Sequence, residues 1–455
     1  MTHKHQEQHS NQIHEEHPHS HPRRADMLSV EEALARVLSL VEPLGAVNIP
    51  LLEADGLVLA EDVYAPFDIP LLANSAMDGY AVQAADLAQA SEEHSITMPV
   101  IGQVQAGKLA NVAVTKGSVI RIMTGAQVPD GADAIVPYEF TDEVERRTSG
   151  LPLTEITLKH APRHGDHVRP AGEDATKDAL VLKKGRQLDP PSIGLLASFG
   201  YAKAPVVRRP RVAILATGDE VQAPGEALEA GRLFDSNTYD AAAAVQRWGG
   251  TPVLLGIARD NMPDLRLKLR QGLDADLLIT SAGVSAGAFD MVKDALSELG
   301  SIDFWSVRMR PARPIAFGLL DASDGRRVPH LGLPGNPVSA LVALVEFGRP
   351  AIAKMRGAIP RSLPTIRAIL DDPIRNTDGR RVYARVSLSK RDGEIHARST
   401  GAQGSNLLTS VAEADGLAIC PEEKLLRDTG EQVVVQLFDW RDHSAVLTEH
   451  LDITK

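Results

Sequence analysis

Apolar runs alternate with helical segments between residues 211 and 354, and this alternation constrains the fold more than any other feature. Runs typical of buried strands cover Val212–Leu215, Val253–Ile257, Asp276–Thr280, Phe304–Met309 and Ile315–Leu319. Apolar residues at helical spacing predict helices over Thr238–Trp248, Pro263–Leu273, Ala288–Leu299 and Pro337–Lys354. Strands and helices that alternate at these lengths predict a three-layer α/β/α sandwich on a mostly parallel sheet.

The segments on either side of this region follow other patterns, so the 455-residue chain is expected to form several domains. Residues 65–177 are rich in Val, Ile, Gly and Pro and predict a β-rich, irregular domain. Residues 359–442 carry short strands and predict a small C-terminal β-barrel. Residues 27–64 and 178–208 are expected to form one discontinuous, helical and linking domain. The prediction is an α/β and β multidomain protein with the α/β domain at 209–358.

Residues 1–26 hold seven of the 15 histidines and almost no apolar side chains. This composition predicts a disordered tail, although neutral imidazoles also bind transition metals loosely. Ordered structure is expected from Ser29, because Ser29-Val-Glu-Glu32 has the form of a helix capping box.

The composition narrows the classes of function. A formal charge of −12 argues against a nucleic-acid-binding protein, whose affinity depends on a basic surface. No apolar run is long enough to span a membrane, and the N-terminus lacks the pattern of a signal peptide. The single cysteine, Cys420, excludes an internal disulfide and a cysteine-based metal site, as is typical of a cytoplasmic protein. An anionic ligand would need positive charges that are gathered locally.

The string Asn74-Ser-Ala-Met-Asp-Gly-Tyr80 is the most informative motif. It follows Pro66 and Pro70, which prevent a helix, so Asp78 is expected to lie in a loop or at the end of a strand. Taken alone, the string is also typical of a turn with a solvated aspartate.

Polar residues follow the predicted strands of the α/β region. Thr217, Asp219 and Glu220 come directly after the first strand, at the edge where open α/β sheets bind ligands. These residues are equally typical of a polar loop that follows a strand and binds no ligand. Asp235-Ser-Asn237 precedes a predicted helix, and Asp235 is expected to cap it.

Two loops are expected to present backbone N–H groups at helix N-termini, where phosphate-like anions bind. One is Ser281–Gly287, which matches neither the Walker nor the dinucleotide pattern. Asp290 follows in the first turn of the next helix, where it would stabilise the helix dipole or hold a metal ion. The other loop, Gly332–Ser339, places Ser339 in the same kind of position.

Local positive charge appears at Arg308, Arg310 and Arg313. Pro311 and Pro314 stiffen this segment, so the guanidinium groups are expected to form a preorganised fork for an oxyanion. The alternative is a basic surface loop.

Several strings occur in a fixed order: NSAMDGYA (74–81), RIMTGA (121–126), GED (172–174), ATGDE (216–220), SAGVSAG (281–287) and GLPGNPVSA (332–340). Through them, residues 27–440 resemble the molybdopterin molybdenumtransferase family, which comprises the MoeA proteins and the E domain of gephyrin. The resemblance implies a four-domain homodimer with a shared active site. It also implies a reaction aided by Mg²⁺, in which molybdate is inserted into the dithiolene of adenylylated molybdopterin and AMP is released. Other molybdenum cofactor enzymes are possible partners.

The resemblance assigns roles to residues at matching positions. Residues with a catalytic role are Asp78, Asp174, Glu220 and Asp290, of which Glu220 and Asp290 would hold the metal. Residues that contact the substrate are Thr124, Thr217, Asp219, Asp260, Gly283, Ser285, Gly287 and Ser339. Residues near molybdate are Arg310, Arg313, Pro314, Ser339, Arg385 and Ser405.

The sequence departs from the family at the arginine segment. Many members have Lys-Pro-Gly-Lys-Pro where this chain has Arg310-Pro-Ala-Arg-Pro314, and arginine is a planar, bidentate donor where lysine is a point charge. Oxyanion selectivity is therefore expected to differ. Two alternatives to the transferase are a molybdopterin-binding scaffold without catalysis and a molybdopterin adenylyltransferase. The number of domains argues against the second.

Overall fold

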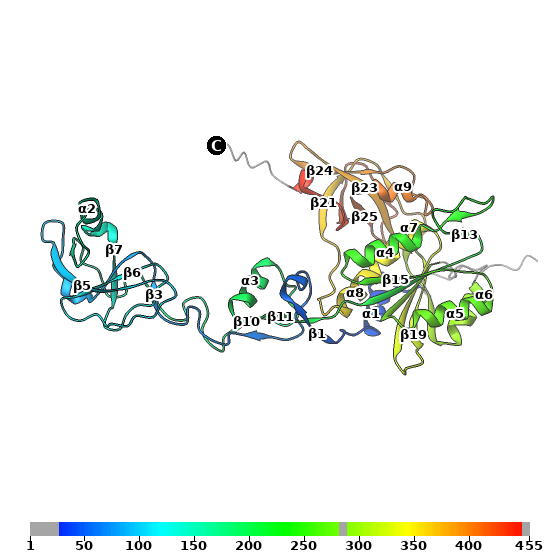
Figure 1. The fold of residues 1–455 in the computed structure, drawn as a ribbon. Helices are drawn as coiled ribbons and strands as arrows, with labels where there is room; N and C mark the ends of the chain where they lie inside the picture. The colour runs from blue at the N-terminus through cyan, green and yellow to red at the C-terminus, as the bar shows by residue number, and fades with distance from the viewer. Residues whose placement is uncertain (1–26, 282–288, 448–455) are drawn as a thin grey trace, which may run out of the picture. The chain divides into compact units, whose positions relative to one another are not determined.

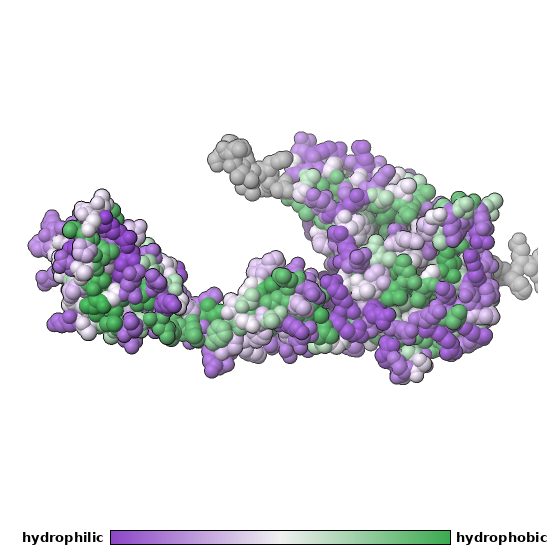
Figure 2. Space-filling view, viewed as in Figure 1, coloured by the Kyte–Doolittle hydropathy of each residue, from purple (hydrophilic) through white to green (hydrophobic). Residues whose placement is uncertain are grey.

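The computed structural model describes residues 27–281 and 289–447, which form two compact units (Figure 1). The β unit comprises residues 46–206, and the cleft unit comprises the described residues before 46 and after 206. Figure 2 shows that the visible surface of both units is mostly hydrophilic, with smaller apolar patches. Within the described ranges, no helix combines the length and the apolar content that a membrane span requires.

A six-stranded sheet in the order β15-β12-β16-β20-β19-β17 forms the centre of the cleft unit. Its strands are β12 (Arg211–Thr217), β15 (Thr251–Ala258), β16 (Leu277–Ser281), β17 (Gly300–Ser306), β19 (Pro314–Asp321) and β20 (Arg327–Leu333). The first four strands in that order run parallel, whereas β19 and β17 are antiparallel additions at one edge. The mostly parallel sheet predicted from the sequence is confirmed.

Helices cover both faces of this sheet (Figure 1). Alternate residues of β12 face opposite layers: Val212 and Ile214 belong to one hydrophobic core, and Ala213 and Leu215 to the other. The second core is completed by α5 (Met262–Gly272) and α6 (Phe289–Ser297). The first is completed by α1 (Val30–Ser39), α4 (Asn237–Arg247), α7 (Pro337–Ala343), the π-helical turn η5 (Leu344–Gly348) and α8 (Arg349–Met355). The predicted three-layer sandwich is therefore confirmed, and the capping box at Ser29 starts α1 as expected.

A five-stranded β-barrel follows. Its strands are β21 (Thr365–Leu370), β23 (Arg381–Arg391), β24 (Glu394–Ser399), β25 (Gly416–Cys420) and β27 (Gln432–Leu437), and it closes because β23 pairs with both β24 and β25. Val382, Ala384 and Val386 point into the barrel core. The alternate residue Tyr383 belongs instead to the core beneath α7 and α8. One face of the barrel thus packs against the helices of the α/β domain.

Short elements complete the cleft unit: β13 (Val221–Gln222), β14 (Leu233–Phe234), β18 (Met309–Arg310), β22 (Ile374–Arg375), α9 (Leu408–Ala412), β26 (Leu426–Arg427) and α10 (Ser444–Leu447). Strand β18 pairs in parallel with β23. This pairing joins the arginine segment of the α/β domain directly to the barrel.

The β unit contains the sheet β7-β4-β6-β5-β8. Its strands are β4 (Gly79–Val82), β5 (Ile96–Val104), β6 (Val119–Ile122), β7 (Ala134–Pro137) and β8 (Glu155–Leu158). Smaller elements are β1 (Ala46–Pro50), η2 (Leu51–Glu53), β2 (Val63–Tyr64), β3 (Asn74–Ser75), η3 (Ala84–Leu87), η4 (Tyr138–Phe140), α2 (Glu143–Thr148), β9 (Val168–Arg169), β10 (Leu180–Leu182), α3 (Pro190–Ser198) and β11 (Lys203–Val207). Leu59 and Val63 share one core with Leu182 and Leu196, so two distant segments pack together. The predicted four-domain boundaries remain a prediction.

A buried ion-pair network supports the strand that follows Asp78. The Glu143 carboxylate accepts hydrogen bonds from the Tyr80 hydroxyl at 2.6 Å, from Arg121 Nη2 at 2.8 Å and from Arg147 Nε at 2.8 Å. Burial acts to raise the pKa of Glu143, but the hydrogen bonds from Arg121 and Tyr80 outweigh it and hold that pKa below its ordinary value. The network therefore stabilises the β unit while Glu143 is ionised.

Replacing Glu143 with Ala is expected to destabilise the β unit by about 3–5 kcal/mol, because Arg121 would lose its buried partner. The depressed pKa means that the stabilisation is present above the ordinary pKa of a glutamate and is lost as the pH falls below it. Urea unfolding of the wild type and the variant across that range measures both effects. Equal stability of the two proteins at neutral pH would contradict the expectation.

Candidate active site

A cleft of about 1120 Å³ lies in the cleft unit, between the α/β domain and the barrel. Strands β12 and β16 end at this cleft with Thr217 and Ser281, which both line it. The carboxyl edge of the sheet is therefore part of the site, as the sequence predicted from the general rule for open α/β sheets. The barrel contributes the opposite side, including Tyr383 and Arg385.

Hydrogen bonds between loops organise the sheet edge. Thr217 Oγ1 donates to the Ser281 carbonyl at 3.3 Å. Asn237 Nδ2 donates to Ser281 Oγ at 2.7 Å and to the Gly335 carbonyl at 2.8 Å. Ser339 is buried in the first turns of α7 and also lines the cleft. Through Asn237, these bonds bring together the two loops that the sequence predicted to bind anions, one at Ser281 and the other at Gly335.

The acidic residues after β12 have different positions. Glu220 lines the cleft, and Gly218 has a φ of 128°. A Cβ at position 218 would lie 2.5 Å from Glu220 Oε2, so glycine allows the carboxylate to fold over the backbone. Asp219 and Asp260 instead hold each other, because each carboxylate accepts a bond from the other's backbone N–H, at 3.3 and 3.4 Å. Neither of these two residues lines the cleft.

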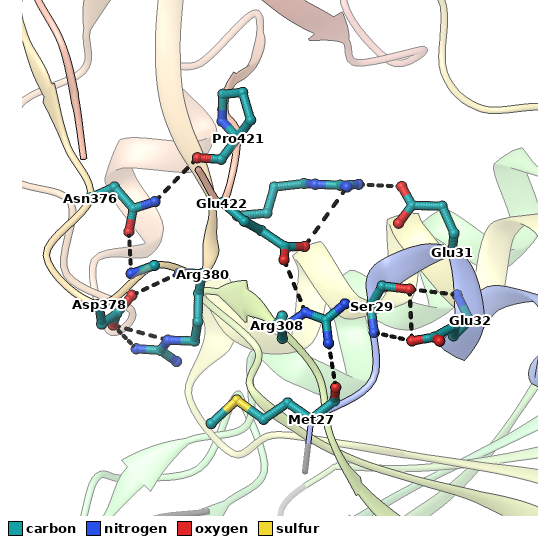
Figure 3. Close-up of polar contacts among 12 residues, drawn as sticks. Met27, Ser29, Glu31, Glu32, Arg308, Asn376, Asp378, Arg380, Pro421 and Glu422 are labelled. Atoms are coloured by element: carbon teal, nitrogen blue, oxygen red, sulfur yellow. Dashed lines mark hydrogen bonds and ion pairs between the residues drawn. The ribbon is translucent and has the colours of Figure 1, made fainter. Parts of the chain in front are cut away.

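The three arginines of the predicted fork separate in the structure. Arg308 donates to Glu422 at 2.9 Å and to the Met27 carbonyl at 2.7 Å (Figure 3), so it connects the N-terminal segment to the barrel. Arg310 lines the cleft but donates to Thr377 Oγ1 at 2.9 Å and lies 3.8 Å from Asp378. The expectation that Arg308 joins the fork is therefore wrong.

Arg313 is the member of this segment whose guanidinium remains available. It lines the cleft, and no described residue makes a hydrogen bond or ion pair with its side chain. Ala312, beside it, is buried and has a φ of 71°, a left-handed backbone that glycine adopts at lower cost. The segment therefore makes this turn with a residue less suited to it than glycine. Pro314 also lines the cleft.

Arg385 is the most unusual residue of the site. Its side chain is among the largest that are fully buried, with an exposure of 1%. It donates to Ser410 Oγ at 3.1 Å and to the carbonyls of Gln403 and Gly404 at 3.2 and 2.9 Å. Burial lowers the pKa of Arg385 to about 10, and no described carboxylate is paired with it. A buried cation with only neutral partners is costly unless an anion compensates it.

The structure adds Gln403, Arg375 and Arg380, which the sequence analysis did not name as site residues. The Gln403 side chain makes two hydrogen bonds to the backbone of Arg385. Its Oε1 accepts from the Arg385 N–H at 2.8 Å, and its Nε2 donates to the Arg385 carbonyl at 3.2 Å. Arg375 and Arg380 also line the cleft, but Arg380 is engaged by Asp378. Asp235 caps α4 by accepting from Thr238 N at 3.0 Å, as expected, and lines the cleft as well. The Asp-Ser-Asn string before α4 was the signal for this position.

The candidate residues of the β unit form a separate group. Asp78 Oδ1 accepts hydrogen bonds from the backbone N–H and the hydroxyl of Thr124, both at 2.7 Å. These two bonds hold the pKa of Asp78 below its ordinary value, so the carboxylate is ionised and fixed in orientation. Asp174 is exposed, and its backbone N–H donates to the Ile69 carbonyl at 2.9 Å.

Four further candidates fall wholly or partly outside the described residues. Gly283, Ser285 and Gly287 belong to residues 282–288, and the side chain of Asp290 is likewise not described. Ser405 lines the cleft, and its carbonyl accepts from Val338 N at 3.1 Å. This bond joins the loop of the barrel to the start of α7.

A large cleft at the carboxyl edge of a parallel sheet, with a buried guanidinium that has no counter-ion among the described residues, defines an anion-binding α/β protein. A model of the MoeA N-terminal region (domain I and II) matches residues 28–200, and a model of the MoeA C-terminal region (domain IV) matches residues 367–438. Residues 213–354 match a probable molybdopterin binding domain. The chain belongs to the molybdopterin molybdenumtransferase family, as its motifs predicted.

Relatives match over almost the whole chain. Molybdopterin molybdenumtransferase 2 of Mycobacterium tuberculosis is 36% identical over 416 residues, which cover 90% of this chain and 99% of the relative. Molybdopterin molybdenumtransferase of Haemophilus influenzae is 34% identical over 417 residues, which cover 91% and 99%. A crystal structure of a MoeA protein from Pyrococcus horikoshii has a TM-score of 0.78 and 30% identity, covering 90% of this chain and 99% of that one.

Proposed function

We propose that this protein inserts molybdenum into molybdopterin, with adenylylated molybdopterin and molybdate as substrates and AMP as a product. The observation that carries the proposal is the buried Arg385 guanidinium, which lines the cleft without a carboxylate partner among the described residues. A small oxyanion would compensate this charge, and Arg313 offers a second available guanidinium in the same cleft. Family membership supports molybdate as the oxyanion.

The residues of the cleft suggest how molybdate is held. Charge-assisted hydrogen bonds from Arg313 and Arg385 would replace part of the hydration of the dianion. Ser339 and Ser405 line the same cleft and supply neutral polar groups. Arg310 is already tied to the barrel through Thr377, so we assign it mainly to holding the two sides of the site together.

The carboxylates fit a magnesium ion. Mg²⁺ prefers oxygen ligands and is usually bound by one or two carboxylates together with substrate phosphates. Glu220 and Asp235 present carboxylates to the cleft, and no larger acidic or histidine cluster occurs among the described residues. Glu220 would hold the ion, with Asp290 as the second ligand that the family resemblance implies. When bound, Mg²⁺ would neutralise charge on the phosphate oxygens as AMP leaves.

We further propose a homodimer with a shared site. Asp78, Thr124 and Asp174 belong to the β unit, whereas Glu220, Arg313 and Arg385 belong to the cleft unit. A subunit arrangement that brings the β unit of one chain to the cleft of another would combine the two groups of residues. This arrangement is the one that the family resemblance implies.

The direct test is to incubate the protein with adenylylated molybdopterin, molybdate and Mg²⁺ and to follow AMP by chromatography. AMP release that requires molybdate, together with transfer of molybdenum to the pterin, is the expected result. Tight binding of molybdopterin without AMP release would favour the scaffold. Conversion of molybdopterin and ATP into adenylylated molybdopterin would favour the adenylyltransferase.

A further inference from the structure

An aromatic side chain is exposed in the cleft. Among the described residues, the aromatic side chains that line the cleft are Phe234 and Tyr383. Tyr383 is 1% exposed and belongs to the core beneath α7 and α8, whereas Phe234 is 39% exposed. Phe234 belongs to none of the hydrophobic cores formed by the described residues. Its ring therefore contributes little to holding the fold together, and an apolar group that is exposed in a groove is typical of a ligand site.

The backbone on both sides of Phe234 is fixed. Strands β13 and β14 form a short parallel ribbon at the edge of the α/β domain (Figure 1), in which Gln222 lies opposite Phe234. The Leu233 N–H donates to the Glu220 carbonyl, and the Asp235 N–H donates to the Gln222 carbonyl, both at 2.9 Å. The residues directly before and after Phe234 are thus held by backbone hydrogen bonds.

A buried side chain also holds the loop that connects the two strands, residues 223–232. Gln222 is 3% exposed. Its Nε2 donates to the Ala227 carbonyl at 2.6 Å, and its Oε1 accepts from the Glu229 N–H at 3.2 Å. The ribbon therefore holds Phe234 in place before any ligand is bound, and such preorganisation lowers the entropic cost of binding.

The same cleft contains groups that bind anions. Arg313 and Arg385 line it, and Asp235, next to Phe234 in the sequence, lines it as well. Asn237 follows two positions later and donates to Ser281 Oγ at the end of β16. A short segment thus connects the exposed ring to the sheet edge of the cleft. A ligand that combines a flat ring with phosphate groups fits this combination of aromatic and cationic side chains.

We propose that Phe234 is a specificity-determining residue that stacks on the heteroaromatic ring of the phosphate-bearing substrate. Stacking on an aromatic side chain accepts any flat heteroaromatic ring, because each has a π-face. In adenylylated molybdopterin this ring is either the adenine or the pterin, so the identity of the ring rests on the proposed function. The exposed ring and its fixed support do not depend on that function.

The test is calorimetric titration of the wild type and Phe234→Ala with AMP and, separately, with molybdopterin. Loss of the ring is expected to weaken binding of one of them by about 5- to 150-fold, the range for removal of a base–aromatic stack. A change for AMP identifies adenine as the stacked ring, and a change for molybdopterin identifies the pterin. Ribose 5-phosphate, which carries the phosphate without the adenine, should bind equally to both proteins.

Kinetics separate binding from chemistry. In the AMP-release assay, Phe234→Ala should raise the KM for adenylylated molybdopterin and leave kcat unchanged, as expected for loss of an interaction made equally in the ground state and the transition state. The molybdate dependence should not change, because Phe234 carries no charge. Phe234→Tyr keeps the ring and should restore the KM of the wild type.

Tyr239→Ala is the matched control. Tyr239 is an exposed aromatic residue at the start of α4 that does not line the cleft. This variant loses a ring of similar size and should bind every ligand as the wild type does. Neither Phe234 nor Tyr239 belongs to a hydrophobic core of the described residues, so both variants should unfold at the temperature of the wild type.

The outcomes are separable. Unchanged affinity of Phe234→Ala for both AMP and molybdopterin would overturn the role of Phe234 and leave the proposed function standing. Dissociation of a dimer in Phe234→Ala, with both affinities unchanged, would also overturn it and show that the ring packs on a second copy of the chain. Weakened binding in Phe234→Ala without AMP release by the wild type would support the ring site and overturn the proposed function. A wild type that binds neither ligand would overturn both.

Discussion

Asp78→Asn is expected to lower molybdate-dependent AMP release by at least about a hundredfold, the lower limit for loss of a positioned acid–base group, with little change in thermal unfolding. Thr124 donates two hydrogen bonds to Asp78 Oδ1, so the asparagine must keep its oxygen there. Its amide nitrogen then replaces Oδ2, the oxygen to which no described residue donates, and an acceptor becomes a donor. Chromatography of AMP and differential scanning fluorimetry measure the two quantities.

Glu139→Gln provides the control for this variant, because Glu139 is an exposed residue of the same unit and loses the same charge. It should retain full activity. Full activity of Asp78→Asn, or its unfolding, would show that Asp78 has no catalytic role.

The proposed homodimer makes the Asp78 variant more informative. Mixing inactive Asp78→Asn chains with inactive Glu220→Ala chains should restore part of the activity, because a mixed dimer would contain one intact shared site. Subunit exchange is verified with two different affinity tags. A mixture that exchanges subunits and remains inactive would show that each site is built within one chain.

Arg313→Ala and Arg385→Ala are each expected to weaken molybdate binding by roughly 10- to 150-fold, since the loss of a charge-assisted hydrogen bond costs about 1.5–3 kcal/mol. Arg313 has no described side-chain partner, so its variant should unfold at the temperature of the wild type. Arg385 also bonds to the carbonyls of Gln403 and Gly404, so Arg385→Ala should lose some stability as well. Arg385→Lys keeps the charge but lacks the planar fork, and its affinity should be intermediate.

Arg380→Ala is the matched control, because Arg380 lines the same cleft while its guanidinium is engaged by Asp378. Its molybdate affinity should change by less than about threefold, as for charges that are screened or already paired. If Arg313→Ala leaves molybdate binding unchanged and weakens the pterin nucleotide instead, the arginine binds phosphate and the molybdate site lies elsewhere.

Sequence patterns predicted most elements of the α/β domain but missed β20, the strand that lies between β16 and β19 in the sheet. The continuous apolar run Val212–Leu215 is a local property of the sequence, and the structure divides these residues between two cores, as a strand covered on both faces requires. The helix expected over Pro337–Lys354 is present but contains the π-helical turn η5. No periodicity in the sequence distinguishes a π-turn, because it shifts the register by only one residue.

The local sequence predicted only some of the residues that line the cleft. Thr217, Glu220 and Ser339 line the cleft because strand ends and helix starts meet at one edge of a parallel sheet. Asp219 does not, although it lies between Thr217 and Glu220 in the sequence, since its carboxylate accepts from the backbone of Asp260.

The sequence by itself determined the family, all strands and helices of the α/β core except β20, and the residue types available for binding an anion. Tertiary structure alone decided which arginine side chains remain available to bind an anion. Arg308, Arg310 and Arg313 are close in sequence, yet Glu422 engages the first, Thr377 and Asp378 constrain the second, and the third has no described partner. The same holds for Arg385, because the burial and the pairing of a charge depend on residues from distant strands and helices. The physical reason is that hydrophobic periodicity is encoded locally, whereas the electrostatic state of a side chain is set by its neighbours in space.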